Sequence, residues 1–157
     1  LSDKAGAASD RATSASAAVA GVAAWGGIGI LRDAHGDGSR LRVVLPEGPV
    51  PSQMDADALA IVVGNLIDNA LQHAPEGTPV DIVLDDAGVL VVRNGGMPVA
   101  AADLARITDR FASRRSGGFG LGLHIARQIA QQAGGRLELH SPAPGRADGF
   151  EARLHLP

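Results

Sequence analysis

The sequence contains no cysteine and a single lysine, Lys4, and only 3% of its 157 residues are aromatic. Without cysteine the chain can form neither a disulfide framework nor a thiolate metal site, which fits a reducing compartment. A nucleic-acid-binding domain usually shows a basic face and stacking rings, whereas the net charge here is −3. We therefore expect no nucleic-acid partner. No apolar run approaches the ~20 residues of a membrane-spanning helix.

The length suits one domain, and a hydrophobic content of 45% is enough to build its core. Residues 1–36 are rich in alanine, serine and glycine and end at a "HGDG" turn. This composition predicts a lead-in or the end of an upstream helix, and we expect residues 37–157 to form the folded domain. The chain starts at Leu1 without a signal-peptide pattern, so we expect it to be a piece of a longer protein.

The pattern between residues 41 and 75 predicts a strand followed by a helix. "LRVVLP" (41–46) is a short β-rich run, and "DADALAIVVGNLIDNALQHAP" has apolar residues at intervals of three and four. Asp55 or Ser52 can cap the helix, and Pro75 stops it. The buried stripe predicted for it consists of Leu59, Val62, Val63, Leu66, Ile67, Ala70 and Leu71.

The rest of the chain predicts a hairpin, a long lid, a helix and a final antiparallel pair. Val80–Leu84 and Val89–Val92 flank "DDAG", and a long loop with one short helix near Ala101–Ile107 comes next. The helix after the glycines carries Leu121, Ile125 and Ile129 on one face and ends at Gly134 or Gly135. "RLELHS" and "GFEARLHL" form the final pair. This order predicts an α/β sandwich, one mixed sheet with helices on one face.

The stretch "GGFGLGLHIA" places glycines 118, 120 and 122 directly before a helix. A helix N-terminus has unpaired N–H groups and a partial positive charge, and glycines let a ligand approach them closely. The stretch is therefore a candidate phosphate cradle, and a merely flexible loop is the alternative. A Rossmann loop has glycines at positions one, three and six, and a Walker loop needs Gly-Lys-Ser/Thr; neither fits.

A polar ridge on the earlier helix forms a second candidate site. Asn65 and Asn69 share one face, and Gln72 and His73 continue it. Such a ridge can simply be solvated, but amide oxygens also suit Mg²⁺, which usually arrives on nucleotide phosphates. Asn94, where a strand meets a Gly-Gly turn, is either a cleft residue or an ordinary turn asparagine.

These elements, in this order, resemble the catalytic ATP-binding domain of sensor histidine kinases, in the superfamily shared with DNA gyrase B, Hsp90 and MutL. "NLIDNALQHA" is similar to the N box, "RNGGMPV" to a variant G1 box, and "DRF" to the F box. "GGFGLGLHIARQIAQQAGGRLEL" is similar to the G2 box and the segment downstream of it. The resemblance covers roughly residues 41–157. It implies a Bergerat-type two-layer fold with about three helices on one face of the sheet and an ATP lid.

The resemblance also implies roles for individual residues. Asn69 matches the asparagine that holds Mg²⁺ on the ATP phosphates, and Asn65 the other N-box asparagine, a candidate catalytic residue. His73 matches a position beside the adenine, and Gln72 one that is often basic. The remaining cofactor-binding candidates lie in the G1 box, the lid and the G2 box: Asn94, Gly96, Ile107, Phe111, Arg114, Gly118, Gly120, Leu121, Gly122 and Leu123.

The G1 box departs from the family pattern Asp-Asn-Gly-Pro-Gly, whose Asp accepts a hydrogen bond from the adenine amine. Aligning Val99 with the last aliphatic position places Asn94 at the Asp, and an amide oxygen can still accept that bond. Aligning Asn94 with the box's own Asn would instead place Arg93 there, and arginine has no acceptor. We prefer the first alignment and expect modest nucleotide affinity.

The resemblance implies a protein histidine kinase that transfers the γ-phosphate of ATP. The superfamily's ATPases carry at the Asn65 position a Glu that activates water; asparagine cannot, which predicts poor hydrolysis. None of the five histidines (His35, His73, His124, His140 and His155) has the sequence context of the phosphoacceptor. The expected partners are therefore ATP, an upstream dimerisation domain with the acceptor histidine, and a response regulator.

We expect the isolated domain to be monomeric and cytoplasmic, in a full-length protein anchored in the inner membrane. Two alternatives stay open at this point. An anti-sigma-factor serine kinase has the same fold, and the altered G1 box also fits a degenerate nucleotide-binding or interaction module.

Overall fold

The computed structural model describes residues 40–107 and 121–157. The predicted lead-in, residues 1–36, and most of the predicted lid lie outside these ranges. The elements are β1 (Leu41–Val44), α2 (Ala56–His73), β2 (Val80–Leu84), β3 (Val89–Asn94), α3 (Ala101–Arg106), α4 (Leu121–Gln132), β4 (Arg136–His140) and β5 (Phe150–His155). The predicted order of strands and helices is confirmed.

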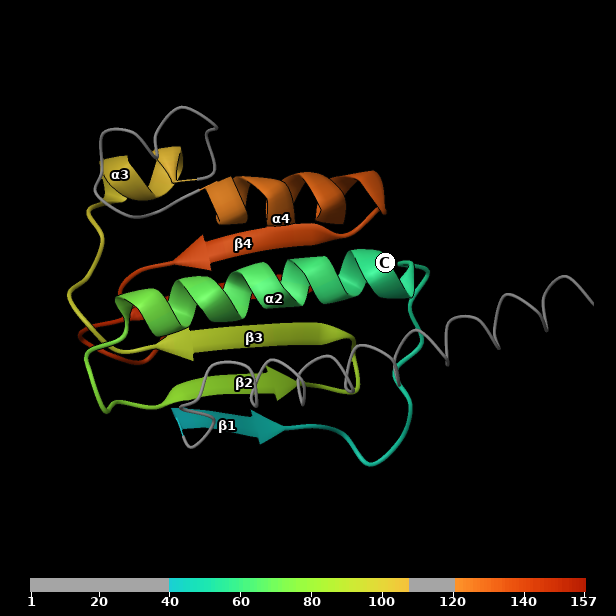
Figure 1. The fold of residues 1–157 in the computed structure, drawn as a ribbon, viewed down its shortest axis with the longest axis horizontal. Helices are drawn as coiled ribbons and strands as arrows, with labels where there is room; N and C mark the ends of the chain where they lie inside the picture. The colour runs from blue at the N-terminus through green and yellow to red at the C-terminus, as the bar shows by residue number, and fades with distance from the viewer. Residues whose placement is uncertain (1–39, 108–120) are drawn as a thin grey trace, which may run out of the picture.

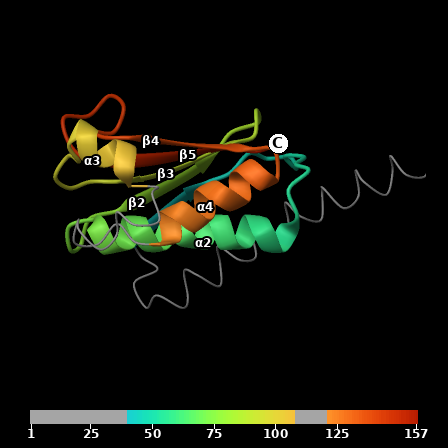
Figure 2. The same ribbon diagram turned by 90° about the horizontal axis from the view of Figure 1, so that it is seen from above.

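Five strands form one mixed sheet in the order β1-β2-β3-β5-β4. β1 runs parallel to β2, and the other neighbouring pairs are antiparallel. α2 and α4 lie side by side in a second layer against one face of the sheet, and the short α3 lies at the end of the molecule near β4 and α4 (Figures 1 and 2). The predicted two-layer α/β sandwich is confirmed.

α2 begins and ends where its sequence predicts. The Asp55 carboxylate accepts hydrogen bonds from the backbone N–H groups of Asp57 and Ala58, at 2.9 and 3.3 Å, which caps the first turn. At the other end Ala74 is already extended, as is usual for a residue before a proline. The buried face of the helix contains Leu59, Val62, Val63, Leu66, Ile67, Asn69 and Ala70.

The strands alternate between the helix-facing side of the sheet and the opposite side. In β2 the buried residues are Val80, Ile82 and Leu84, whereas the residues between them are half-buried. The same alternation runs through β3 to its last residue, so Asn94 is buried on the helix-facing side. The alternation therefore decides to which side of the sheet the Asn94 amide belongs.

α4 packs through a different stripe from the one its large apolar residues suggest. Its buried residues are Leu123, Ala126 and Ala130, whereas Leu121 is 50% exposed. The small alanine side chains let α4 lie close to α2, and this contact sets the helix's rotation. Among the helices of residues 40–107 and 121–157, none has the length and apolarity needed to cross a bilayer.

Candidate functional site

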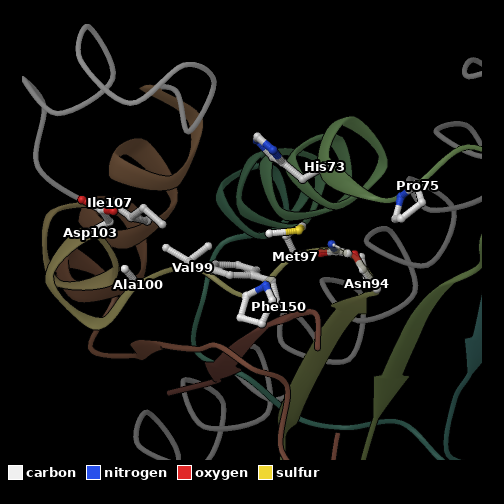
Figure 3. Close-up of a pocket in the computed structure, with 12 residues that line it drawn as sticks. His73, Pro75, Asn94, Met97, Val99, Ala100, Asp103, Ile107 and Phe150 are labelled. Carbon is white, nitrogen blue, oxygen red and sulfur yellow. Dashed lines mark hydrogen bonds between the residues drawn. The ribbon is translucent and has the colours of Figure 1, made fainter. Parts of the chain in front are cut away.

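A cavity of about 590 Å³ opens between the C-terminal end of α2, the ends of β3 and β5, and α3. His73 and Pro75 line it from the end of α2, and Asn94 lines it from the end of β3. Val99, Ile107 and Phe150 supply apolar wall (Figure 3). The combination of an apolar wall with a few polar groups is typical of a small-molecule site.

Asn94 is a buried polar residue of this cavity and is only 3% exposed, whereas the other polar side chains that line it, His73 and Asp103, are half-buried and exposed, respectively. Its Nδ2 donates to the Gly95 carbonyl oxygen at 2.7 Å, which fixes the orientation of the amide. Its Oδ1 is buried and has no hydrogen-bond partner within the described part of the chain. An unpaired buried acceptor is costly, and it belongs to one of the residues that line the cavity.

Arg93 lies on the opposite face of the sheet from this cavity. Its Nε and Nη2 contact Oε2 of Glu151 at 2.8 and 2.6 Å, and Nη2 of Arg153 contacts Oε1 at 2.7 Å. Glu151 is fully buried between them. The alignment that would have put Arg93 against a ligand therefore has no geometric support, and the cavity receives an acceptor from Asn94.

The turn after Asn94 is held against two other parts of the chain. The Gly96 carbonyl accepts from the Gly149 N–H at 2.7 Å, and the Ser141 hydroxyl accepts from the Val99 N–H at 2.8 Å. Gly96 has a φ of +118°, and a Cβ there would lie 3.2 Å from the His73 carbonyl oxygen. Only glycine allows the turn to approach the end of α2 this closely, and this contact closes one side of the cavity.

The polar ridge of α2 meets the start of α4. A Cβ at Gly122 would lie 3.1 Å from Oδ1 of Asn65, so Gly122 lies against the asparagine ridge. Asn69 is buried, at 8% exposure, whereas Gln72 is exposed. Residues 40–107 and 121–157 hold no cluster of histidine and carboxylate side chains that could bind a metal.

The structure thus gathers some of the predicted residues and leaves others apart. His73, Asn94, Gly96 and Ile107 line the cavity, whereas Asn65, Asn69 and Gly122 are not among its lining residues. Asn65 and Gly122 contact each other instead. The Leu123 side chain is in the core, at 1% exposure, so only its backbone can face a ligand. The predicted residues Phe111, Arg114, Gly118 and Gly120 lie outside the described ranges.

Sequence reasoning missed Phe150 as a cavity residue. Phe150 is the register partner of Asn94 across β3 and β5, and it is buried on the same side of the sheet. The alternation of "GFEARLHL" contained this information, but only the strand pairing shows which residue faces Asn94. Met97 also lines the cavity, although the sequence indicated only its place within the G1 motif.

Comparison with known proteins agrees with this geometry. The family model of histidine kinase-, DNA gyrase B- and HSP90-like ATPases matches residues 54–157. Sensor protein QseC of Escherichia coli K12 is 38% identical over 99 residues, which is 61% of this chain and 21% of QseC. Histidine protein kinase DivJ of Caulobacter vibrioides is 35% identical over 112 residues, or 66% of this chain and 19% of DivJ.

The solved structure of the mycobacterial sensor histidine kinase MprB superposes with a TM-score of 0.63 at 27% identity, over 81% of this chain and 91% of that one. The chain spans about a fifth of the length of the two curated relatives. All three similar proteins are histidine kinases, so the serine-kinase alternative is not favoured. The chain belongs to the histidine kinase-, DNA gyrase B- and HSP90-like ATPase family, as a catalytic ATP-binding domain of the sensor-kinase type.

Proposed function

We propose that the cavity binds the adenine of Mg²⁺–ATP, and that the domain supplies the γ-phosphoryl group to a histidine on an upstream domain of the same protein. A response regulator would then take the group from that histidine. The observation that carries this proposal is the unpartnered Oδ1 of Asn94, a residue that lines the cavity. We assign residues 37–157 to the domain and residues 1–36 to the connection from upstream.

The cavity suits a base that offers an amine. Since Nδ2 of Asn94 is already bonded to Gly95, only the oxygen is free, and an oxygen accepts from the adenine amine. A base with a carbonyl oxygen in place of the amine would instead bring that oxygen, an acceptor, against the Asn94 oxygen, a second acceptor. The amide therefore acts as a selective acceptor although it carries no charge.

The junction of α2 and α4 suits the phosphates. The first turn of α4 leaves backbone N–H groups without helical partners, and Gly122 lets Asn65 lie against that turn. Asn69, buried on the same ridge, would hold Mg²⁺ through its amide oxygen. ATP supplies the phosphoryl group, and the metal reduces the repulsion between its phosphate charges.

Asn65 supports transfer rather than hydrolysis. A general base must accept a proton at neutral pH, and an amide cannot. Asn65 can only orient a ligand through hydrogen bonds. We therefore infer that the domain hydrolyses ATP slowly and keeps the γ-phosphoryl group for the acceptor histidine. We further propose that the domain works in the cytoplasm, in a full-length protein anchored in the inner membrane.

Calorimetric titration with ATP and inosine triphosphate tests the base end. Inosine triphosphate carries a carbonyl oxygen where ATP carries the amine. We expect the chain to prefer ATP by about fivefold or more, because one buried hydrogen bond is worth about 1–3 kcal/mol when its loss leaves a polar group unpaired. Asn94→Ala should abolish most of that preference. Equal affinities in the unmodified chain would contradict the proposed role of Asn94.

Magnesium dependence tests the phosphate end. Asn69→Ala should weaken Mg²⁺–ATP binding and remove most of the difference between titrations with Mg²⁺ and with EDTA. Gln131→Ala, on an exposed position of α4, is the matched control. Failure of the unmodified chain to bind Mg²⁺–ATP at millimolar concentration would refute the proposed function.

Phosphotransfer is tested with ATP labelled on the γ-phosphate. The chain alone should gain no acid-labile phosphohistidine, since its histidines lack the acceptor context. Addition of the upstream histidine-bearing domain from the same full-length protein should give label on that domain. Label on a serine of a partner protein would instead support the serine-kinase alternative.

A further inference from the structure

Met97 places a thioether at the mouth of the cavity. Its side chain is 90% exposed, and it lines the cavity together with His73 and Asn94. In Figure 3 its sulfur lies in the opening between these two residues. Met97 therefore combines high exposure with a position at the edge of the proposed ligand site.

The chain's other sulfur is protected. The sequence has two methionines and no cysteine, and Met54 is only 1% exposed in the hydrophobic core. A peroxide must reach a sulfur to oxidise it. The fold therefore makes one sulfur reactive and shields the other, which provides an internal control within the same molecule.

Oxidation of Met97 would change the chemistry of the cavity mouth. Methionine sulfoxide is polar and carries an acceptor oxygen but no donor. The neighbouring wall from Val99, Ile107 and Phe150 is apolar, so a ligand that covered the sulfoxide would have to remove its water without returning a hydrogen bond. The cavity already holds one unpaired acceptor at Asn94, and the sulfoxide would add a second.

We propose that Met97 is an oxidation site whose sulfoxide weakens nucleotide binding. This inference rests on the proposed function of the cavity. In the reaction the thioether sulfur attacks the terminal oxygen of a hydroperoxide, the S–O bond forms and the O–O bond breaks. The sulfur is oxidised by two electrons, and the peroxide is reduced to water or an alcohol. A sulfoxide reductase with a dithiol reductant restores the thioether.

The first test measures oxidation of the intact chain by hydrogen peroxide, with peptide mass spectrometry at both methionines. We expect Met97 to oxidise at least about ten times faster than Met54, because reactivity follows exposure. Saturating Mg²⁺–ATP should slow oxidation of Met97 severalfold and leave Met54 unchanged. Equal rates at Met97 with and without ATP would count against a nucleotide that covers the sulfur, and so against the proposal.

The second test compares ATP affinity before and after oxidation. The singly oxidised chain should bind Mg²⁺–ATP about 5- to 10-fold more weakly, a change on the order of 1 kcal/mol, and a sulfoxide reductase should restore the affinity. As a control, the Mg²⁺–ATP affinity of the Met97→Leu variant is measured before and after peroxide treatment, and the treatment should not change it. Unchanged affinity of the oxidised chain would overturn this inference and leave the ATP site intact. Absence of ATP binding before oxidation would overturn both.

Discussion

Asn94→Asp introduces the residue that the resemblance to the family's G1 box places at this position, and we expect it to weaken ATP binding at neutral pH. The aspartate would place an oxygen where Nδ2 now lies, 2.7 Å from the Gly95 carbonyl oxygen. Two acceptors at that distance repel each other. In the free protein the carboxylate can turn away from Gly95. When one of its oxygens accepts from a bound adenine, the other has to face the Gly95 carbonyl oxygen, and the repulsion between these two oxygens opposes binding.

The expected change in ATP affinity follows from two opposing free-energy contributions. A charged acceptor strengthens the bond to the adenine amine by about 1 kcal/mol over a neutral one. Against this stands the unpaired buried acceptor pair that forms only in the complex, about 1–3 kcal/mol. The bond to Gly95 is lost from the free and the bound variant alike and cancels, so the net loss is about 0–2 kcal/mol, or up to roughly 30-fold in affinity.

The pH dependence provides a second signature of the same geometry. Burial, and the carbonyl of Gly95, should raise the pKa of the carboxyl introduced by Asn94→Asp above the ordinary aspartate value of about 3.9. The protonated acid can donate to Gly95 while its other oxygen accepts, as the amide does now. The variant should therefore bind ATP more tightly at lower pH, relative to the unmodified chain at the same pH.

Calorimetry at pH 5, 6.5 and 8, with ATP titrated into both proteins, measures these effects. The ratio of the two affinities at each pH removes the titration of ATP itself. Thermal unfolding of both proteins checks that the substitution leaves the fold intact. Tighter binding by Asn94→Asp at pH 8 would refute the reasoning, because it would mean that the turn at Gly95 adapts to a carboxylate.

Three further predictions concern packing and charge. Gly122→Ala should weaken Mg²⁺–ATP binding severalfold in calorimetry, because its Cβ would displace the amide of Asn65, 3.1 Å away. Glu151→Ala should lower the free energy of unfolding in urea by about 3 kcal/mol, because it leaves two arginines facing each other without their buried carboxylate. The hydrogen bond from His155, aided by nearby cations, lowers the pKa of Glu138. That stabilisation is present above the ordinary glutamate pKa and is lost as the pH falls through the lower folded-state pKa, so Glu138→Gln should flatten the acid limb of a urea-midpoint profile.

The first two of these predictions have control variants. Gly48→Ala introduces a Cβ with no atom within 4 Å, so it should leave ATP affinity unchanged. Glu151→Gln keeps the shape and one acceptor, and it should cost less than Glu151→Ala. If Glu151→Ala lowers the free energy of unfolding by less than about 1 kcal/mol, the ion pairs of Glu151 with Arg93 and Arg153 contribute no more than exposed pairs do. An unchanged acid limb for Glu138→Gln would contradict its part in acid stability.

Much of the fold is set by local patterns. The spacing of apolar residues in α2, the Asp55 cap and the proline after its C-terminus fix that helix within the sequence itself. The hairpin is set by its two β-branched runs, and the carboxylate of Asp85 stabilises the turn by accepting from the N–H groups of Ala87 and Val89. These features need only neighbours within a few residues, so a sequence shows them directly.

The orientation of α4 could not be predicted in this way. Its largest apolar residues suggest one stripe, but the helix packs through Leu123, Ala126 and Ala130. Close approach to α2 favours small side chains, and the fit between two helices is a property of the pair. The position of Leu121 on an exposed surface is a consequence of that fit.

By itself the sequence determined the order of the elements, the ends of α2 and the presence of asparagine and glycine motifs that resemble a kinase site. Only the tertiary structure decided that Asn94 faces the cavity while Arg93 faces away, that Phe150 lies opposite Asn94, and that Met97 is exposed at the mouth. The physical reason is that local patterns depend on backbone propensity and periodicity. Which residue lies opposite a strand's last residue, by contrast, depends on its register with strands far away in the chain.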